Sequence, residues 1–87
     1  MPEISRFFGI VITMYADDHA PPHFHARYSE HQAVIKIEDG EPITGSLPRH
    51  ALRLVQDWAE LHKEELLQNF NESNKDDPHF IKIKPLE

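Results

Sequence analysis

The sequence has 87 residues, enough for one domain, and its composition of 39% hydrophobic and 28% charged residues is typical of a globular chain. Cysteine is absent, which excludes disulfide bonds, thiolate nucleophiles and cysteine-ligated zinc or iron–sulfur sites. The 9 basic and 15 acidic residues give a net charge of −6, which disfavours tight DNA binding by the isolated chain, because neutralising phosphates supplies most of that affinity.

Hydropathy gives no sign of a membrane or export role. No apolar run approaches the roughly 18 residues that a membrane helix needs. The N-terminal region lacks the charged and apolar segments of a secretion signal. We therefore expect a cytoplasmic protein without membrane association.

The first half of the chain predicts β-strands. Phe7–Tyr15 is aromatic and β-branched, which predicts a central strand, and Ala16–Pro22 is a connection, because its two prolines cannot donate to a ladder. His23–Tyr28 predicts the next strand. Its alternation places Phe24, Ala26 and Tyr28 on one face and His23, His25 and Arg27 on the other.

Further strands are predicted after a turn over Ser29–Gln32. Ala33–Ile37 completes a β-hairpin with the strand before the turn, and Asp39–Gly40 signals another turn. Glu41–Thr44 predicts a short fourth strand that ends at Gly45.

The second half predicts helix. Ser46 is the expected N-cap and Pro48 lies in the first turn, where its missing N–H costs nothing. A single helix from Leu47 to Asn71 would be ~37 Å long, so we expect a bend near His62–Glu64 or a projecting second half that meets a partner. One face carries the apolar stripe Ala51, Leu52, Val55, Trp58, Ala59, His62, Leu66 and Phe70, leaving Leu54, Leu61 and Leu67 off it.

Together these elements predict an α+β fold. A small antiparallel sheet of three or four strands is packed on one face by a C-terminal long helix or kinked helix pair. Residues 1–45 are β-rich, residues 46–73 are helical, and residues 74–87 form a tail or an edge strand.

The segment from Asp17 to His25 is the candidate chemical site. The pair His23 and His25 points to one side of its strand with Cβ atoms ~7 Å apart, a usual way to offer two nitrogen ligands to a metal. Asp17, Asp18, His19 and Glu30 are near enough in sequence to supply a further ligand, and we favour Asp18 and His19. An N/O set suits a divalent transition metal such as Zn, Ni, Fe or Mn. General acid–base catalysis by His23 and His25, or a purely structural role for these rings, fits the pattern as well.

Two basic groups are secondary candidates for anion binding. Arg49, His50 and Arg53 lie at the predicted helix start, where an anion would be favoured, although a solvated first turn is the simpler interpretation. Arg6, Arg27 and Lys36 fall on predicted strands, and a surface shared by them would steer an anionic ligand.

Several segments resemble a known family. They are Ile4–Ile10, Met14-Tyr15, Asp18–Ala26 with its Pro-Pro-His-Phe-His run, Leu47-Pro48, and the positions Ala51, Leu52, Val55, Trp58, Leu61, His62, Glu65 and Leu66. The sequence resembles a small bacterial family of domains of unknown function, family 4160. The resemblance implies a prokaryotic cytoplasmic protein, often encoded beside a second small domain as in toxin–antitoxin pairs, and it defines no catalytic residues.

Three functional hypotheses follow. The first is a regulatory or interaction module that binds a small protein encoded nearby or self-associates. The second is a His- or metal-dependent ribonuclease or phosphoesterase, in which His23 or His25 acts as general base; the strand order also resembles small toxin ribonucleases, so RNA remains an open partner. The third is a metal-binding module without catalysis. The acidic balance and the long helix favour the first.

Overall fold

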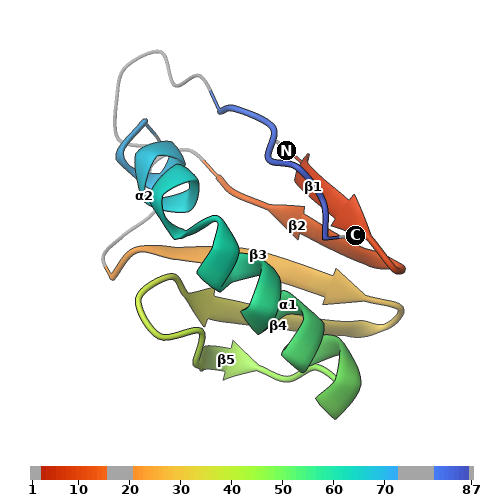
Figure 1. Ribbon diagram of the computed structural model, residues 1–87. Coiled ribbons are helices and arrows are strands. Elements are labelled where there is room, and N and C mark those ends of the chain that lie inside the picture. Colours follow the sequence, from red (N-terminus) through yellow and green to blue (C-terminus); the bar gives the residue numbers. More distant parts are fainter. Residues whose placement is uncertain (1–2, 16–20, 73–79, 87) are drawn as a thin grey trace.

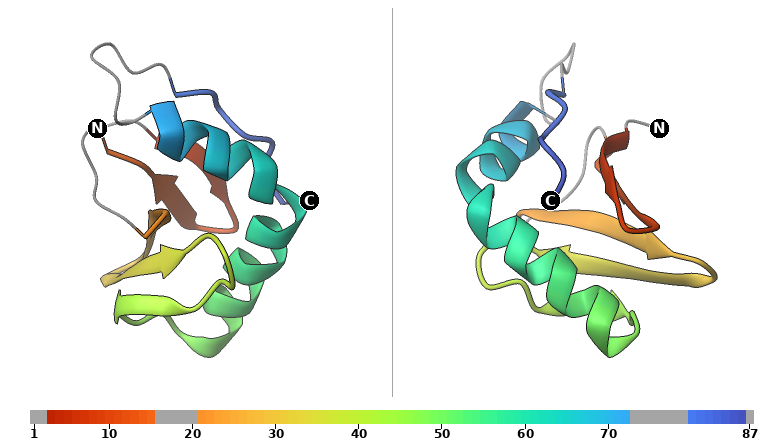
Figure 2. Two further views of the ribbon diagram at one scale, coloured as in Figure 1. Left: turned by 90° about the vertical axis from the view of Figure 1, so that its left-hand side faces the viewer. Right: turned by 45° about the vertical axis from the view of Figure 1, so that its right-hand side comes forward.

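The computed structural model describes residues 3–15, 21–72 and 80–86. Within them the chain forms a five-stranded antiparallel sheet in the order β1-β2-β3-β4-β5, followed by two helices (Figure 1). The fold class is α+β, as the sequence predicts, with five strands where three or four were expected. Both helices lie on one side of the sheet (Figure 2).

The extra strand comes from a turn inside the first apolar segment. The single strand predicted over Phe7–Tyr15 is wrong, because the chain reverses at Phe8 and Gly9 and separates β1, Glu3–Phe7, from β2, Ile10–Thr13. Both turn residues have positive φ, 49° at Phe8 and 81° at Gly9, the backbone that a two-residue hairpin turn requires. Because Phe8 is apolar, the sequence around the turn reads as one continuous apolar segment.

The remaining strands follow the predicted order. The third strand, β3, spans His23–Tyr28 as expected. It pairs with β4, His31–Lys36, whose start is two residues earlier than expected. The last strand, β5, spans Pro42–Gly45 and pairs with β4 across a register shift at Val34/Ile35.

The helical region divides at His62. The first helix, α1, spans Arg49–Leu61, and the second, α2, spans Lys63–Glu72. The predicted N-cap at Ser46 is wrong, because the N-cap is Pro48, which has no side-chain cap. The backbone N–H of Ser46 instead donates to the Gln32 carbonyl and continues the sheet contacts.

The core lies between the helices and the inner face of the sheet. Trp58 on α1 is fully buried, and its ring packs edge-to-face with Phe24 on β3, with centroids 5.8 Å apart. Buried residues of the predicted helical stripe line the same core, namely Ala51, Val55, Ala59, Leu66 and Phe70. Leu52 of the stripe is half-buried, and Leu61, off the stripe, is exposed.

The C-terminal segment 80–86 runs beside β1 without forming a strand (Figure 1). The N–H of Ile83 donates to the Ile4 carbonyl at 2.8 Å, and the Ile83 side chain is buried. Neither helix, in the parts of the chain that the structure describes, is long and apolar enough to cross a membrane.

Candidate functional site

The side chains of β3 point alternately toward the core and toward the candidate site. Phe24 and Ala26 point under the helices and are buried, while His23 and His25 point to the other face and are half-buried. Arg27 is exposed on the same outer face. The sheet therefore has one face covered by helices and one helix-free face, which carries His25 and Arg27. His23, at the start of β3, also contacts Phe70 of α2.

His23 is oriented by the backbone just before its strand. Its Nδ1 lies 2.8 Å from the carbonyl oxygen of Pro21. A carbonyl can only accept, so Nδ1 carries the proton and Nε2 is the basic nitrogen of the neutral ring. The ring also packs against Phe70 at the end of α2, with centroids 5.6 Å apart. These contacts fix both the tautomer and the direction of the imidazole.

Three rings form a continuous ring cluster of Tyr15, His25 and His23. The centroids of His23 and His25 are 5.5 Å apart, and those of His25 and Tyr15 are 4.5 Å apart with an interplanar angle of 85°. Edge-to-face contacts of this kind hold aromatic rings at defined angles. His25 is thus the centre of the cluster and has a packed neighbour on each side.

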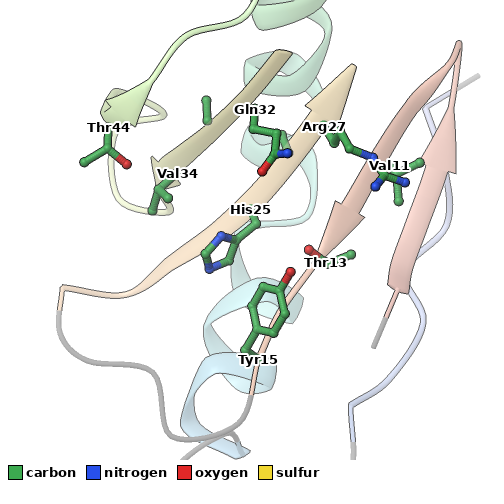
Figure 3. A pocket seen from close by; sticks show the side chains of 10 residues that line it. Val11, Thr13, Tyr15, His25, Arg27, Gln32, Val34 and Thr44 are labelled. Atoms are coloured by element: carbon green, nitrogen blue, oxygen red, sulfur yellow. The ribbon is translucent and has the colours of Figure 1, made fainter. Parts of the chain in front are cut away.

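A pocket of about 380 Å³ opens beside this cluster on the helix-free face (Figure 3). Its walls come from four strands and from Tyr15, which follows β2. The polar side chains that line it are Thr13, Tyr15, His25, Arg27, Gln32 and Thr44, and the β-branched apolar ones are Val11 and Val34.

The strand register explains why these residues meet. Thr13, His25 and Val34 are cross-strand partners, with Thr44 opposite Val34, so they form one row across the sheet. A second row, one pleat further along, contains Val11, Arg27 and Gln32. Residues in such rows lie side by side on one face.

None of the described residues that line the pocket is acidic. The nearest carboxylate in the register is Glu3, which is opposite Thr13 on β1. Its Oε1 accepts a 2.7 Å hydrogen bond from Arg6, and this bond lowers the pKa of Glu3 below its usual value, aided by the charges of Arg6, Lys82 and Arg27. Glu3 is therefore a carboxylate already paired with an arginine, and it lines a separate hollow beside the C-terminal segment.

The predicted site residues fall into two groups. His23 and His25 lie together, and of the two only His25 lines the pocket, whereas Asp18 and His19, the other proposed metal ligands, lie outside the described residues. Among the residues that the structure describes, no group of three His, Asp or Glu side chains is arranged to hold a metal ion. Two of the four proposed ligands, His23 and His25, therefore lie together, and the described segments bring no third ligand to them.

The secondary anion candidate at the helix start is partly engaged elsewhere. The Nε2 of His50 lies 3.4 Å from the Tyr28 hydroxyl, and the two rings meet edge-to-face with centroids 5.5 Å apart. This contact attaches the first turn of α1 to β3. Arg49 and Arg53 remain exposed around it.

Sequence reasoning missed the contributions of Thr13, Tyr15 and Gln32. Tyr15 and Thr13 fell within a single predicted strand, and Gln32 was assigned to a turn. Their convergence depends on the registers of β2 with β3 and of β3 with β4, which join separate segments of the chain. The usable signal was the period-two spacing of Val11, Thr13 and Tyr15, which places all three on one face.

Comparison with known proteins identifies the family. No curated protein and no solved structure matches this chain. A family model described as a domain of unknown function, DUF4160, matches residues 9–71, which include β2 to β5, α1 and most of α2. Because the match covers well over half of the sequence, the chain belongs to the DUF4160 family.

Proposed function

We propose that this chain is a regulatory or interaction module that binds a partner protein with the helix-free face of its sheet. The partner we favour is the small protein encoded beside it in a two-gene cassette of the toxin–antitoxin kind. The observation that supports this proposal is the pocket on that face, formed by the side chains of four strands and Tyr15.

The residues that line the pocket are more typical of a surface that binds a partner than of one that contacts only water. The open face of an antiparallel sheet is ordinarily polar and solvated. Here Val11 and Val34 are half-buried and lie between hydrogen-bonding groups such as Thr13 and Gln32. Apolar contact combined with a few placed polar groups is typical of recognition surfaces.

The test is calorimetric titration of the purified chain with the purified product of the neighbouring gene. Thr44→Glu and Val34→Glu place a charge on the helix-free face and should weaken the complex by about tenfold or more. Leu61→Glu is the matched control, because Leu61 is 71% exposed at the end of α1. It should leave the affinity unchanged.

Two outcomes would refute this proposal. One is the absence of a complex with the wild-type chain. The other is loss of binding in Leu61→Glu together with normal binding in both sheet variants, which would place the partner on the helices. Circular dichroism melting curves of all variants verify that each one is folded.

His-dependent cleavage of RNA or another phosphoester is the second candidate function. The observation that favours it is that His25 and Arg27 line one pocket, with the ring of His23 next to that of His25 at a centroid distance of 5.5 Å. One imidazole would act as general base and the guanidinium would stabilise the developing negative charge.

A fluorogenic RNA substrate tests the second candidate. The wild-type chain should cleave it, and the double variant His23→Ala/His25→Ala should not. His31→Ala is the control, because His31 is exposed on the next strand and does not line the pocket. Absence of cleavage by the wild type, or full activity in the double variant, would remove this function.

A further inference from the structure

We propose that the pocket on the helix-free face binds the phosphate group of a nucleotide. This inference rests on the proposed function, because it takes that face as the working surface, and it names the chemical class of a ligand that would regulate or compete with the partner there. Three features of the pocket support it, namely an array of donors, the distribution of charge and a neighbouring pair of rings.

The donors form a compact array across three strands. Thr13 on β2 is opposite His25 on β3, and Arg27 on β3 is opposite Gln32 on β4. Neighbouring strands are about 4.8 Å apart and the two rows are about 7 Å apart along β3. A hydroxyl, an imidazole, a guanidinium and an amide can all donate hydrogen bonds. Four donors around one hollow match the several outer oxygens of a phosphate better than the two of a carboxylate.

The charge distribution selects an anion. The chain has a net charge of −6, yet none of the described residues lining this pocket is acidic and Arg27 brings a positive charge to it. Within residues 3–15, 21–72 and 80–86, the structure records no ion pair for Arg27. A second hollow, of about 510 Å³ between the β4–β5 turn and α1, is lined by five carboxylates and one lysine. Negative charge is therefore gathered away from the helix-free face.

The ring cluster supports a ligand larger than a bare phosphate. Tyr15 and His25 both line the pocket, and their rings are 4.5 Å apart at 85°. Nucleobases stack on aromatic rings, and Tyr15 lines the same pocket as the donors. The pocket volume of about 380 Å³ also lies in the range of small-ligand sites.

The experiment is an NMR titration of the isotope-labelled chain with adenosine monophosphate, adenosine and inorganic phosphate. We expect adenosine monophosphate to bind most tightly and to shift the amide signals of β2, β3 and β4. A short single-stranded oligoadenylate distinguishes the source of the phosphate: tighter binding than the mononucleotide indicates an RNA strand, and weaker binding indicates a free nucleotide. Affinity should decrease as salt is added, because the contact with Arg27 is electrostatic.

Arg27→Gln is the decisive variant, and it should weaken binding of adenosine monophosphate by about tenfold, because charge-assisted hydrogen bonds are the strong ones. Arg27 is exposed, so the fold should be unaffected, which a melting curve verifies. Arg53→Gln is the matched control at the exposed start of α1 and should bind as the wild type does.

The proposal fails if adenosine monophosphate binds no better than adenosine, or if Arg53→Gln loses as much affinity as Arg27→Gln. The second result would place the anion at the start of α1. Its failure is separable from that of the proposed function: a chain that binds the neighbouring gene product but no nucleotide keeps its interaction role and loses only this ligand.

Discussion

The indole N–H of Trp58 donates a 2.9 Å hydrogen bond to the backbone carbonyl of Lys84 and so joins the centre of the core to the C-terminal segment. Trp58 is fully buried and also packs against Phe7, with centroids 5.4 Å apart, and against Phe24. A buried indole needs a partner for its N–H. Here that partner comes from the segment that runs beside β1, so this one side chain contacts the sheet and the C-terminal segment at once.

Substitution of Trp58 should therefore destabilise the whole domain. Trp58→Phe retains most of the apolar bulk but leaves the Lys84 carbonyl without the indole, so we expect a loss of about 1–3 kcal/mol in the free energy of unfolding. Trp58→Ala should cost about 3–5 kcal/mol. Urea denaturation measures both.

Leu61→Ala, at a site that is 71% exposed on the same helix, is the control and should change stability by less than about 0.5 kcal/mol. Equal stability of Trp58→Phe and wild type would contradict the role given to this bond.

Asn69 on α2 should control the attachment of the C-terminal segment. Its side-chain amide donates to the Ile81 carbonyl at 2.8 Å and its Oδ1 accepts from the Ile81 N–H at 2.9 Å, while the residue is 1% exposed. Asn69→Leu removes both bonds and should cost about 2 kcal/mol. Amide hydrogen exchange should show lost protection at Ile81. Gln68→Leu, next to it on the exposed face, should leave that protection intact. Unchanged exchange at Ile81 in Asn69→Leu would refute the prediction.

Phe8 is a strained position that a substitution can relieve. It adopts φ 49° in the β1–β2 turn, and its ring is 60% exposed. Left-handed backbone is costly for a bulky residue and suits asparagine in a two-residue hairpin turn. Phe8→Asn should raise the free energy of unfolding by about 0.5–1 kcal/mol, measured by urea denaturation. Phe8→Ala, which keeps a Cβ without the side-chain amide, should give a smaller gain. A destabilised Phe8→Asn would show that the exposed ring contributes more than the strain costs.

The same turn shows what sequence reasoning could and could not reach. The alternation of His23–Tyr28 predicted both the strand and its two faces, because a half-buried strand has a period of two. The division of the helix near His62 was predicted from the excessive length of a single helix. The Phe8–Gly9 turn was missed, because its first residue is apolar and the usual Asn or Asp signal is absent.

The candidate site shows more clearly which contacts a local sequence pattern does not predict. His23 and His25 were paired from the pattern of one strand, and their rings lie together at a centroid distance of 5.5 Å. Tyr15 and Gln32 come from other segments, and their meeting with His25 depends on cross-strand register. A one-residue error in register moves every side chain to the opposite face. Ser46 failed as an N-cap because α1 begins at Arg49, which places the N-cap at Pro48.

Acid should destabilise the fold partly through Asp39 in the turn before β5. Its Oδ1 accepts a 3.0 Å hydrogen bond from the Glu41 N–H, which lowers the pKa of Asp39 below its ordinary value of 3.8, and Lys36 adds to the effect with a 3.2 Å ion pair. A carboxylate whose pKa is lower in the folded state stabilises that state above its unfolded pKa, and this stabilisation is lost as the pH falls through the folded pKa. The urea midpoint of the wild type should therefore decrease from about pH 7 to about pH 3, and Asp39→Asn should show a smaller decrease.

Asp57→Asn is the control, because Asp57 is an exposed carboxylate on α1 for which the described part of the chain records no such hydrogen bond. A decrease in Asp39→Asn as large as that of the wild type would show that this turn contributes nothing to the acid sensitivity.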